Sequence, residues 1–351
     1  MDMIKKIVAV LISCMMLCAL LAGCGEGGDK VVLNVYNVGD YIDEQVLDMF
    51  EEENPGIKIN YETYYTNEEM YVKVANSGSS YDVVFPSDYM VQKMIATGQL
   101  NKINTANIPN LSNIGAQYLG KDYDPADEYS VPYMWGTMGI LYNKTMVEEP
   151  VTSWKILWDE KYEKNIFMLN SERDSIGITL KMLGYSLNSM QETELEAAKN
   201  ALIEQKPLVL AYAEDDVKDK MINGEAAMTV AWSGDAFYCM AENPDLAYAI
   251  PQEGSNLWFD AMAIPASSKH QAEAEKFIDF MCRPDIAKMN AEYIGYSTAN
   301  VTAQQMLEDG VKNDPLRYPD LSTLQGLEVF SYNEALTERY SALWQELKIA
   351  G

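Results

Sequence analysis

Strand-like and helix-like segments alternate along this 351-residue chain, and that alternation most constrains its fold. The β-branched run at residues 31–36 precedes Ile42, Val46 and Phe50, which have helical spacing, and the helix-stopping Asn-Pro-Gly at 54–56 follows. Further strands are predicted at 57–61, 81–85, 139–142, 165–169, 208–213, 226–231, 246–250 and 258–264, with helices between them. This rhythm predicts an α/β fold whose parallel-rich sheets are covered by helices on both faces.

The chain is longer than one hydrophobic core usually supports. From Lys269 onward its pattern becomes mostly helical, and a last helix is expected from about residue 332 to 347. We therefore expect two lobes.

The first residues have the pattern of an export signal. A lysine pair precedes the apolar residues 7–21, a run shorter than the roughly 20 residues of a membrane span. The following Leu-Ala-Gly-Cys sequence, which ends at Cys24, resembles the lipobox of bacterial lipoproteins. We expect residues 1–23 to be a lipoprotein signal peptide, Cys24 to carry lipid and residues 24–30 to form a flexible tether. An uncleaved anchor helix and an unlipidated signal peptide are the alternatives, and each places the globular part outside the cell membrane.

The formal net charge of -27 limits the partners of the chain. So negative a protein repels nucleic acid and anionic headgroups and raises the local concentration of cationic solutes. The same charge also keeps an exported protein soluble, so it favours a cationic ligand only weakly.

Residues that carry catalysis or bind metals are scarce. His270 is the single histidine and lies in a polar run that resembles a surface helix start, so neither a catalytic triad nor a histidine metal site is expected. Residues 77–80 lack the lysine and spacing of a phosphate-binding loop. Cys239 and Cys282 lie among apolar residues and are expected to be small core residues, with one disulfide as the alternative. We expect no enzyme, no cofactor and no metal, and keep a surface enzyme as the alternative class.

Several loops after predicted strands are unusually aromatic and acidic. They cover residues 36–41, 86–89, 169–174, 231–235 and 257–260. Doubly wound sheets bind ligands at the carboxyl ends of their strands, so these loops are the candidate binding site.

Five segments in this order, YNVGDYID, PSDYMVQKM, VPYMWG, LWFDAMAIP and IGYSTANV, resemble the spermidine/putrescine-binding family of polyamine importers. The resemblance runs from about Val31 to the C-terminus. It implies a two-lobed periplasmic-binding-protein-like fold of type II, with the polyamine in a cleft between lobes and hinges near 136–139, Asp260 and residue 306. The implied lobes comprise residues 31–136 with 261–305, and residues 137–260 with 306–351.

The family's binding residues are carried over position by position. The aromatic walls fall on Tyr41, Tyr89, Trp232, Trp258 and Tyr296, the ammonium-binding groups on Asp40, Ser87, Asp174 and Asp260, and the remaining ligand-binding positions on Val38, Gly39 and Ser171. A polyamine is an apolar chain with cationic ends, so aromatic faces suit its length and carboxylates its ends.

The chain departs from the family pattern at three positions. Val38 replaces the usual Trp, Ser171 replaces a common second acid, with Glu172 as a candidate replacement, and the polar Gln contact has no counterpart near Phe330. Putrescine is then at least as well supported as spermidine, and another organic cation stays open. Another small polar solute is a further alternative, and Arg173 in the cleft would favour a carboxylate ligand.

The resemblance also implies partners and location. The expected partners are a polyamine ligand, the membrane permease and ATPase subunits of an ABC importer, and the membrane through lipid on Cys24. We expect a monomer that binds no nucleic acid, in the periplasm or on the outer face of the cell membrane.

Overall fold

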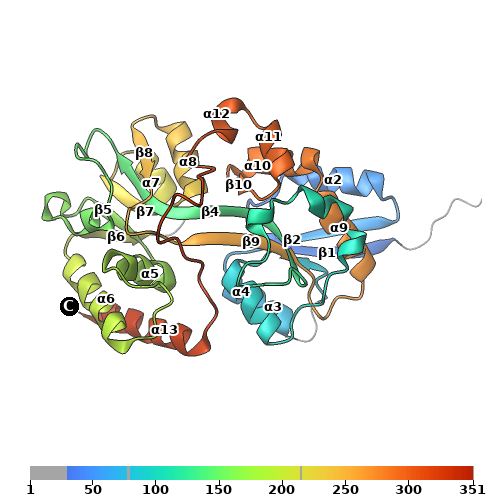
Figure 1. Cartoon of the computed structure of the whole chain (residues 1–351), viewed down its shortest axis with the longest axis horizontal. Helices are drawn as coiled ribbons and strands as arrows, with labels where there is room; N and C mark the ends of the chain where they lie inside the picture. The colour runs from blue at the N-terminus through green and yellow to red at the C-terminus, as the bar shows by residue number, and fades with distance from the viewer. Residues whose placement is uncertain (1–29, 77–79, 214–215, 351) are drawn as a thin grey trace, which may run out of the picture.

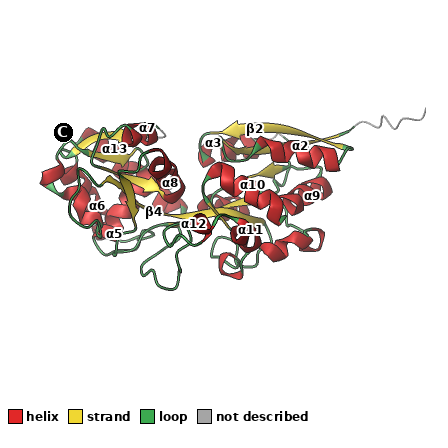
Figure 2. Ribbon diagram, turned by 90° about the horizontal axis from the view of Figure 1, so that it is seen from above, coloured by secondary structure: helices red, strands yellow, loops and turns green. Residues whose placement is uncertain are grey.

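The computed structural model describes residues 30–76, 80–213 and 216–350, so the predicted signal peptide and Cys24 lie outside the described residues. Two halves lie side by side, each with helices packed around strands, and the views in Figure 1 and Figure 2 agree on this arrangement. Among the described residues, no helix combines the length and apolar character that crossing a membrane requires.

The strands and helices follow the predicted alternation. The strands are β1 (Val31–Val38), β2 (Ile57–Tyr64), β3 (Val83–Val84), β4 (Ser130–Asn143), β5 (Ile166–Leu169), β6 (Val209–Ala213), β7 (Met228–Trp232), β8 (Leu246–Ala249), β9 (Leu257–Ala263) and β10 (Ser297–Thr298). The helices are α2 (Glu44–Glu53), α3 (Asn67–Ala75), α4 (Asp88–Ala96), α5 (Glu172–Met182), α6 (Glu192–Gln205), α7 (Val217–Ile222), α8 (Ser233–Glu242), α9 (Gln271–Met281), α10 (Pro284–Ile294), α11 (Val301–Met306), α12 (Asp309–Lys312) and α13 (Glu334–Ile349).

The strands form one continuous ladder in the order β2-β1-β3-β9-β4-β7-β5-β6, with β8 and β10 also paired to β4. Parallel pairs join β1 to β2 and β3, and β5 to β6 and β7. The strands β4 and β9, near the middle of the ladder, are antiparallel to their neighbours. The α/β class with parallel-rich sheets flanked by helices is confirmed.

The long strand β4 belongs to both halves. Its first part, up to Thr137, pairs with β9, and its second part, from Met138, pairs with β7. Figure 1 shows β4 running from one half into the other. A strand shared in this way joins the halves without a flexible linker.

Two further segments pass beside β4. Met138 N donates to Asn256 O at 3.0 Å, and Leu257 N donates to Glu328 O at 2.8 Å. Gly254 has φ of +93°, and a Cβ there would lie 2.1 Å from the carbonyl oxygen of Gly326. The close approach of these two segments therefore requires glycine at 254.

Separate hydrophobic cores fill the halves. The first core contains residues from β1 to the start of β4, from β9 and from α9 and α10. Two further clusters fill the second half. Taken together, they contain residues from the end of β4, from β5 to β8 and from α13. The predicted lobe boundaries stay a proposal, and the cores differ from them at two places. Leu257 and Phe259 pack in the first core, because β9 pairs with the part of β4 that lies in the first half. Leu307, which the prediction assigned to the second lobe, also packs in the first core.

The two cysteines of the globular part are buried and free. Burial raises the pKa of the Cys239 thiol to about 12 and that of Cys282 further. The expectation of small core residues is confirmed.

Candidate functional site

The predicted site residues Tyr41, Ser87 and Asp260 form one hydrogen-bonded group. Asp260 lies in β9, and its carboxylate accepts from Ser87 Oγ and from the Tyr41 hydroxyl, each at 2.6 Å. Burial raises the pKa of Asp260, and the two hydroxyl donors partly oppose this effect. Asn67 holds Ser87 in place, because its Nδ2 donates to Ser87 Oγ and its Oδ1 accepts from Ser87 N, each at 3.0 Å. Nothing in the sequence pattern pointed to Asn67.

A second carboxylate, Asp88, is bonded to the residue that precedes Asp260 in β9. Its oxygens accept from Tyr89 N at 2.6 Å and from Phe259 N at 2.9 Å, and the residue is 2% exposed. Burial raises the pKa of Asp88 to about 7, and the neighbouring charge of Asp260 adds to this rise. The sequence analysis placed Asp88 in the candidate loop 86–89 but assigned it no role, so its electrostatic coupling to Asp260 was missed.

Three of the predicted aromatic walls contact one another beside Asp260. The ring centroid of Tyr296 lies 5.6 Å from that of Tyr41 and 5.3 Å from that of Trp258. These separations are typical of aromatic pairs in protein interiors. Tyr41 and Trp258 are buried, whereas Tyr296 is half-buried. The aromatic group therefore adjoins the carboxylate that the prediction assigns to an ammonium.

Ser171 and Asp174 lie together at the start of α5, in the other half of the molecule. Ser171 caps the helix by accepting from Asp174 N at 3.3 Å, and its hydroxyl donates to Asp174 Oδ2 at 2.7 Å. Asp174 is buried in the first turn, where the helix dipole favours an anion. The Glu172 carboxylate accepts from Ser341 Oγ on α13 at 2.5 Å, so it is directed away from Asp174.

Arg173 connects α5 with α4 and α3. Its guanidinium lies 3.7 Å from the ring centroid of Tyr89, and one of its nitrogens is 4.0 Å from Glu68 Oε1. The Tyr89 hydroxyl donates to the same Glu68 oxygen at 3.0 Å. One face of the predicted wall Tyr89 is therefore covered by a cation of this chain.

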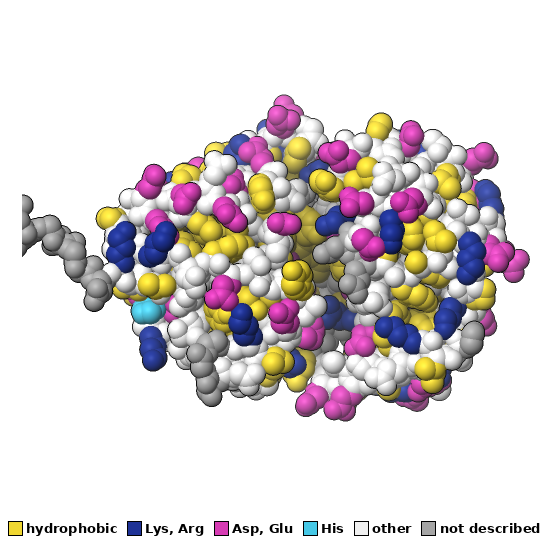
Figure 3. Space-filling model, turned by 180° about the vertical axis from the view of Figure 1, so that it is seen from behind, with side chains coloured by type: hydrophobic (Ala, Val, Ile, Leu, Met, Phe, Trp, Pro, Cys, Tyr) yellow, Lys and Arg dark blue, Asp and Glu magenta, His cyan; other side chains and the backbone are white. Residues whose placement is uncertain are grey.

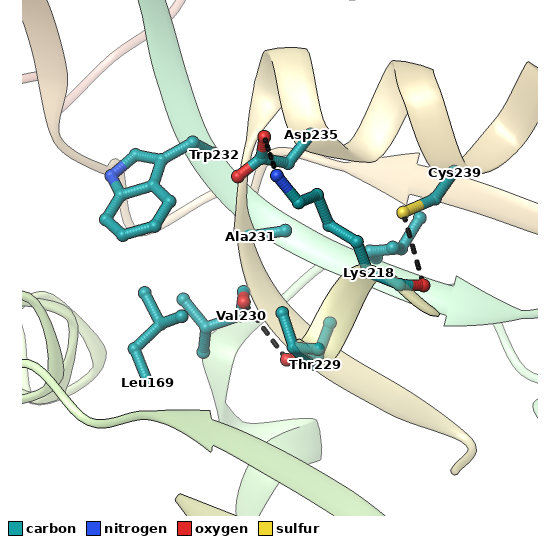
Figure 4. Close-up of a pocket in the computed structure, with 10 residues that line it drawn as sticks. Leu169, Lys218, Thr229, Val230, Ala231, Trp232, Asp235 and Cys239 are labelled. Atoms are coloured by element: carbon teal, nitrogen blue, oxygen red, sulfur yellow. Dashed lines mark hydrogen bonds and ion pairs between the residues drawn. The ribbon is translucent and has the colours of Figure 1, made fainter. Parts of the chain in front are cut away.

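Trp232 ends β7 and is half-buried. Figure 4 shows it beside a small pocket whose lining includes Lys218, Asp235 and Cys239. The Lys218 ammonium lies 3.7 Å from Asp235 Oδ1. Asp235 belonged to a loop that the sequence singled out, but only Trp232 of that loop was predicted to bind ligand.

The predicted positions at the end of β1 and just after it are half-buried to exposed. Val38 packs partly against the first core, Gly39 N donates to Tyr64 O at 3.2 Å, and Asp40 is exposed with φ of +54°. Asp40 contributes to the raised pKa of Tyr61. The exposure of Asp40 is what a solvated surface acid would have, and its role in binding stays a prediction.

Figure 3 shows a groove between the two halves on the face opposite to that of Figure 1, with hydrophobic side chains inside it. In the described ranges, His, Cys, Asp and Glu side chains form no group of three or more that could hold a metal ion.

Two lobes that share a crossing strand, with a groove between them, are the architecture of a solute-binding protein. Residues 45–319 match the family model of bacterial extracellular solute-binding proteins. The spermidine/putrescine-binding periplasmic protein of Escherichia coli strain K12 is 36% identical over 332 residues, which cover 94% of this chain and 95% of that protein.

Solved structures agree with this class. The spermidine/putrescine ABC transporter substrate-binding protein PotD of Streptococcus pneumoniae has a TM-score of 0.83 and 40% identity, covering 92% of this chain and 99% of that chain. The TpPotD lipoprotein of Treponema pallidum has a TM-score of 0.80 and 27% identity, covering 90% and 99%. The chain belongs to the spermidine/putrescine-binding protein family. Its relatives are solute-binding proteins, and its location is extracytoplasmic.

Proposed function

We propose that this protein captures a polyamine in the groove between its lobes and delivers it to an ABC importer. The observation that carries the proposal is Asp260, a half-buried carboxylate whose hydrogen bonds come from the hydroxyls of Ser87 and Tyr41. A carboxylate that is partly withdrawn from water gains from a counter-charge, and a protonated amine supplies one. The rings of Tyr41, Trp258 and Tyr296 would then line the apolar carbons next to that amine.

The curated relatives support this ligand class. One is named for binding spermidine and putrescine, and others are named for putrescine with cadaverine or agmatine. All of these ligands are cationic amines, and the sequence departures at Val38 and Ser171 keep putrescine as well supported as spermidine. Asp174, near the start of α5, is the proposed partner of a second ammonium.

A carboxylate-bearing solute is less well supported. Arg173 is the cation that would attract it, but its guanidinium stacks on Tyr89 and adjoins Glu68 and Asp174. These two acids already supply negative charge around the guanidinium, which weakens its pull on an anionic ligand.

Calorimetric titration of the ligand-free protein with putrescine and with spermidine tests the proposal. We expect saturable binding of at least one of them, and Asp260→Asn should weaken it about 30-fold or more, because the ammonium would lose about 2 kcal/mol of charge-assisted bonding. The thermal stability of the ligand-free variant should change little. Asp245→Asn, which removes an exposed acid after α8, is the matched charge control.

Folded protein that gives no heat with either amine would refute the function. Equal losses of affinity and ligand-free stability in Asp260→Asn would instead assign Asp260 to the fold.

We further propose that lipid on Cys24 holds the protein, as a monomer, at the outer face of the membrane near its permease. The Leu-Ala-Gly-Cys sequence supports this anchor, and one solved relative is named a lipoprotein. Two or more acyl chains would make the attachment stable, since a single chain is marginal.

A further inference from the structure

The hydroxyl of Tyr296 is bonded across the boundary between the lobes. Tyr296 lies between α10 and β10 and packs against the first core, whereas Asp235 lies in the first turn of α8, which packs in the other half. The Tyr296 hydroxyl donates to Asp235 Oδ1 at 2.9 Å. This bond fixes the direction of a ring that contacts both Tyr41 and Trp258.

The backbone positions that contact the rings of Tyr296 and Trp258 are glycines. A Cβ on Gly234 would lie 1.5 Å from Cδ1 of Tyr296, and a Cβ on Gly136 would lie 2.5 Å from Cζ2 of Trp258. No real Cβ approaches a carbon so closely, so both rings depend on glycine for their position. The Ser-Gly-Asp sequence after Trp232 therefore supplies both the space for the Tyr296 ring and the acceptor for its hydroxyl.

Asp235 is placed differently from Asp260. Its Oδ1 adjoins the ammonium of Lys218 at 3.7 Å, as Figure 4 shows, so a cation of this chain already lies beside it. A carboxylate with its own cation gains less from a ligand ammonium than a buried carboxylate bonded by hydroxyls.

We propose that Asp235 is a positioning residue of the polyamine site, which acts by holding Tyr296 rather than by binding the ligand. With its hydroxyl committed to Asp235, Tyr296 offers its ring to the carbon chain of the amine. Gly234 also positions Tyr296, because any side chain at 234 would displace its ring. This inference rests on the proposed polyamine function.

A double-mutant cycle measured by calorimetry with putrescine tests the coupling. Asp235→Ala and Tyr296→Phe should each weaken binding about 10-fold, and the double variant should also lose about 10-fold rather than about 100-fold, since both changes break the same bond. Asp235→Asn keeps the acceptor oxygen and should bind within about threefold of the wild type. Asp245→Asn, at the exposed acid after α8, is the matched charge control and should also stay within about threefold. Independent losses in the double variant, or an Asn variant as weak as the Ala variant, would overturn the proposal.

A second measurement does not depend on ligand. With 3-fluorotyrosine at position 296, the fluorine resonance of the ligand-free protein should shift in Asp235→Ala and Gly234→Ala but not in Asp245→Asn. An unchanged resonance in Asp235→Ala would overturn the positioning role. If the wild type binds no polyamine, the proposed function fails, and this resonance still decides whether Asp235 positions Tyr296.

Discussion

At the scale of single residues, the site combines a half-buried carboxylate, Asp260, with a buried one, Asp88, and their hydrogen-bond partners differ. Asp260 is bonded by side-chain hydroxyls, whereas Asp88 is bonded by the backbone amides of Tyr89, next to it in the chain, and of Phe259 in β9. Burial disfavours ionisation of Asp88, and the neighbouring charge of Asp260 adds to this effect because like charges repel. A cation bound beside them would relieve that repulsion.

Asp88 should therefore make polyamine binding depend on pH. Its pKa of about 7 means that a cation which favours the ionised form releases a proton on binding near neutral pH. We expect affinity to rise between pH 6 and pH 8 and binding to release up to about one proton, which calorimetry in buffers of different ionisation enthalpy measures. Asp88→Asn should flatten both responses, whereas Asp245→Asn should keep them.

The stability of the ligand-free protein should depend on pH in the opposite sense to the affinity for polyamine. The folded-state pKa of Asp88 lies above its ordinary value, so the ionised form costs folding free energy, and stability should fall as pH rises from about 4 through about 7. The melting temperatures of the wild type and of Asp88→Asn measure this effect. If the wild type became more stable relative to Asp88→Asn as the pH rose over this range, the raised pKa would be contradicted.

The sequence predicted site residues that belong to a recognisable family pattern. It did not predict residues whose role depends on which distant segments they contact. Tyr41, Ser87 and Asp260, predicted from the resemblance, do lie within hydrogen-bonding distance, although their binding role stays a prediction. Asn67 and Asp88 act through contacts between segments far apart in the chain, and no local pattern reports such contacts.

At the scale of secondary-structure elements, β4 is the strand that the sequence predicted least completely. Only residues 139–142 were predicted, whereas the strand begins at Ser130. Its first part contains Pro132, which argues against a strand interior, and the structure accommodates this proline where the register with β9 shifts between Pro132 and Met134. The strand is also buried along nearly its whole length, so it lacks the alternating pattern that marks a half-buried strand.

The helices α5 and α4 approach one another through Arg173 and Tyr89. Because this cation–π contact joins the two halves, removing it should favour the open form of the ligand-free protein by about 1 kcal/mol, a change of roughly fivefold in the ratio of closed to open molecules. For Arg173→Ala we expect a larger radius of gyration in small-angle X-ray scattering without ligand, and little change with saturating ligand.

Arg173→Lys separates charge from stacking. Lysine keeps the cation near Glu68 but loses the planar group on Tyr89, so an intermediate radius is expected. Identical scattering from the wild type and Arg173→Ala would show that this contact does not hold the lobes together.

At the scale of the whole molecule, the proposed attachment to the membrane would depend on one residue, Cys24, which lies outside the described ranges. Cys24→Ala should shift the protein from the membrane fraction to the soluble fraction, because the acyl chains supply the binding energy. Fractionation together with the mass of the N-terminal peptide measures this. Cys18→Ala, within the apolar run, should leave the attachment intact, and wild-type protein with residues 1–23 present and no lipid would refute the anchor.

The sequence predicted two lobes from length and alternation, but it could not predict how they touch. The bond from Tyr296 to Asp235 and the stack of Arg173 on Tyr89 join residues that are far apart in the chain. Such contacts depend on the relative placement of two cores, which hydrophobic periodicity within each core does not specify.

The position of β9 within the sheet also sets the order in which the chain can fold. β9 lies between β3 and β4, so the first lobe lacks an inner strand until residues 257–263 are available, long after β1 has been made. If the chain crosses the membrane with its N-terminus first, as the predicted signal peptide implies, the first lobe stays incomplete until residues 257–263 have crossed. Contacts between such distant segments also slow folding, so the groove assembles late.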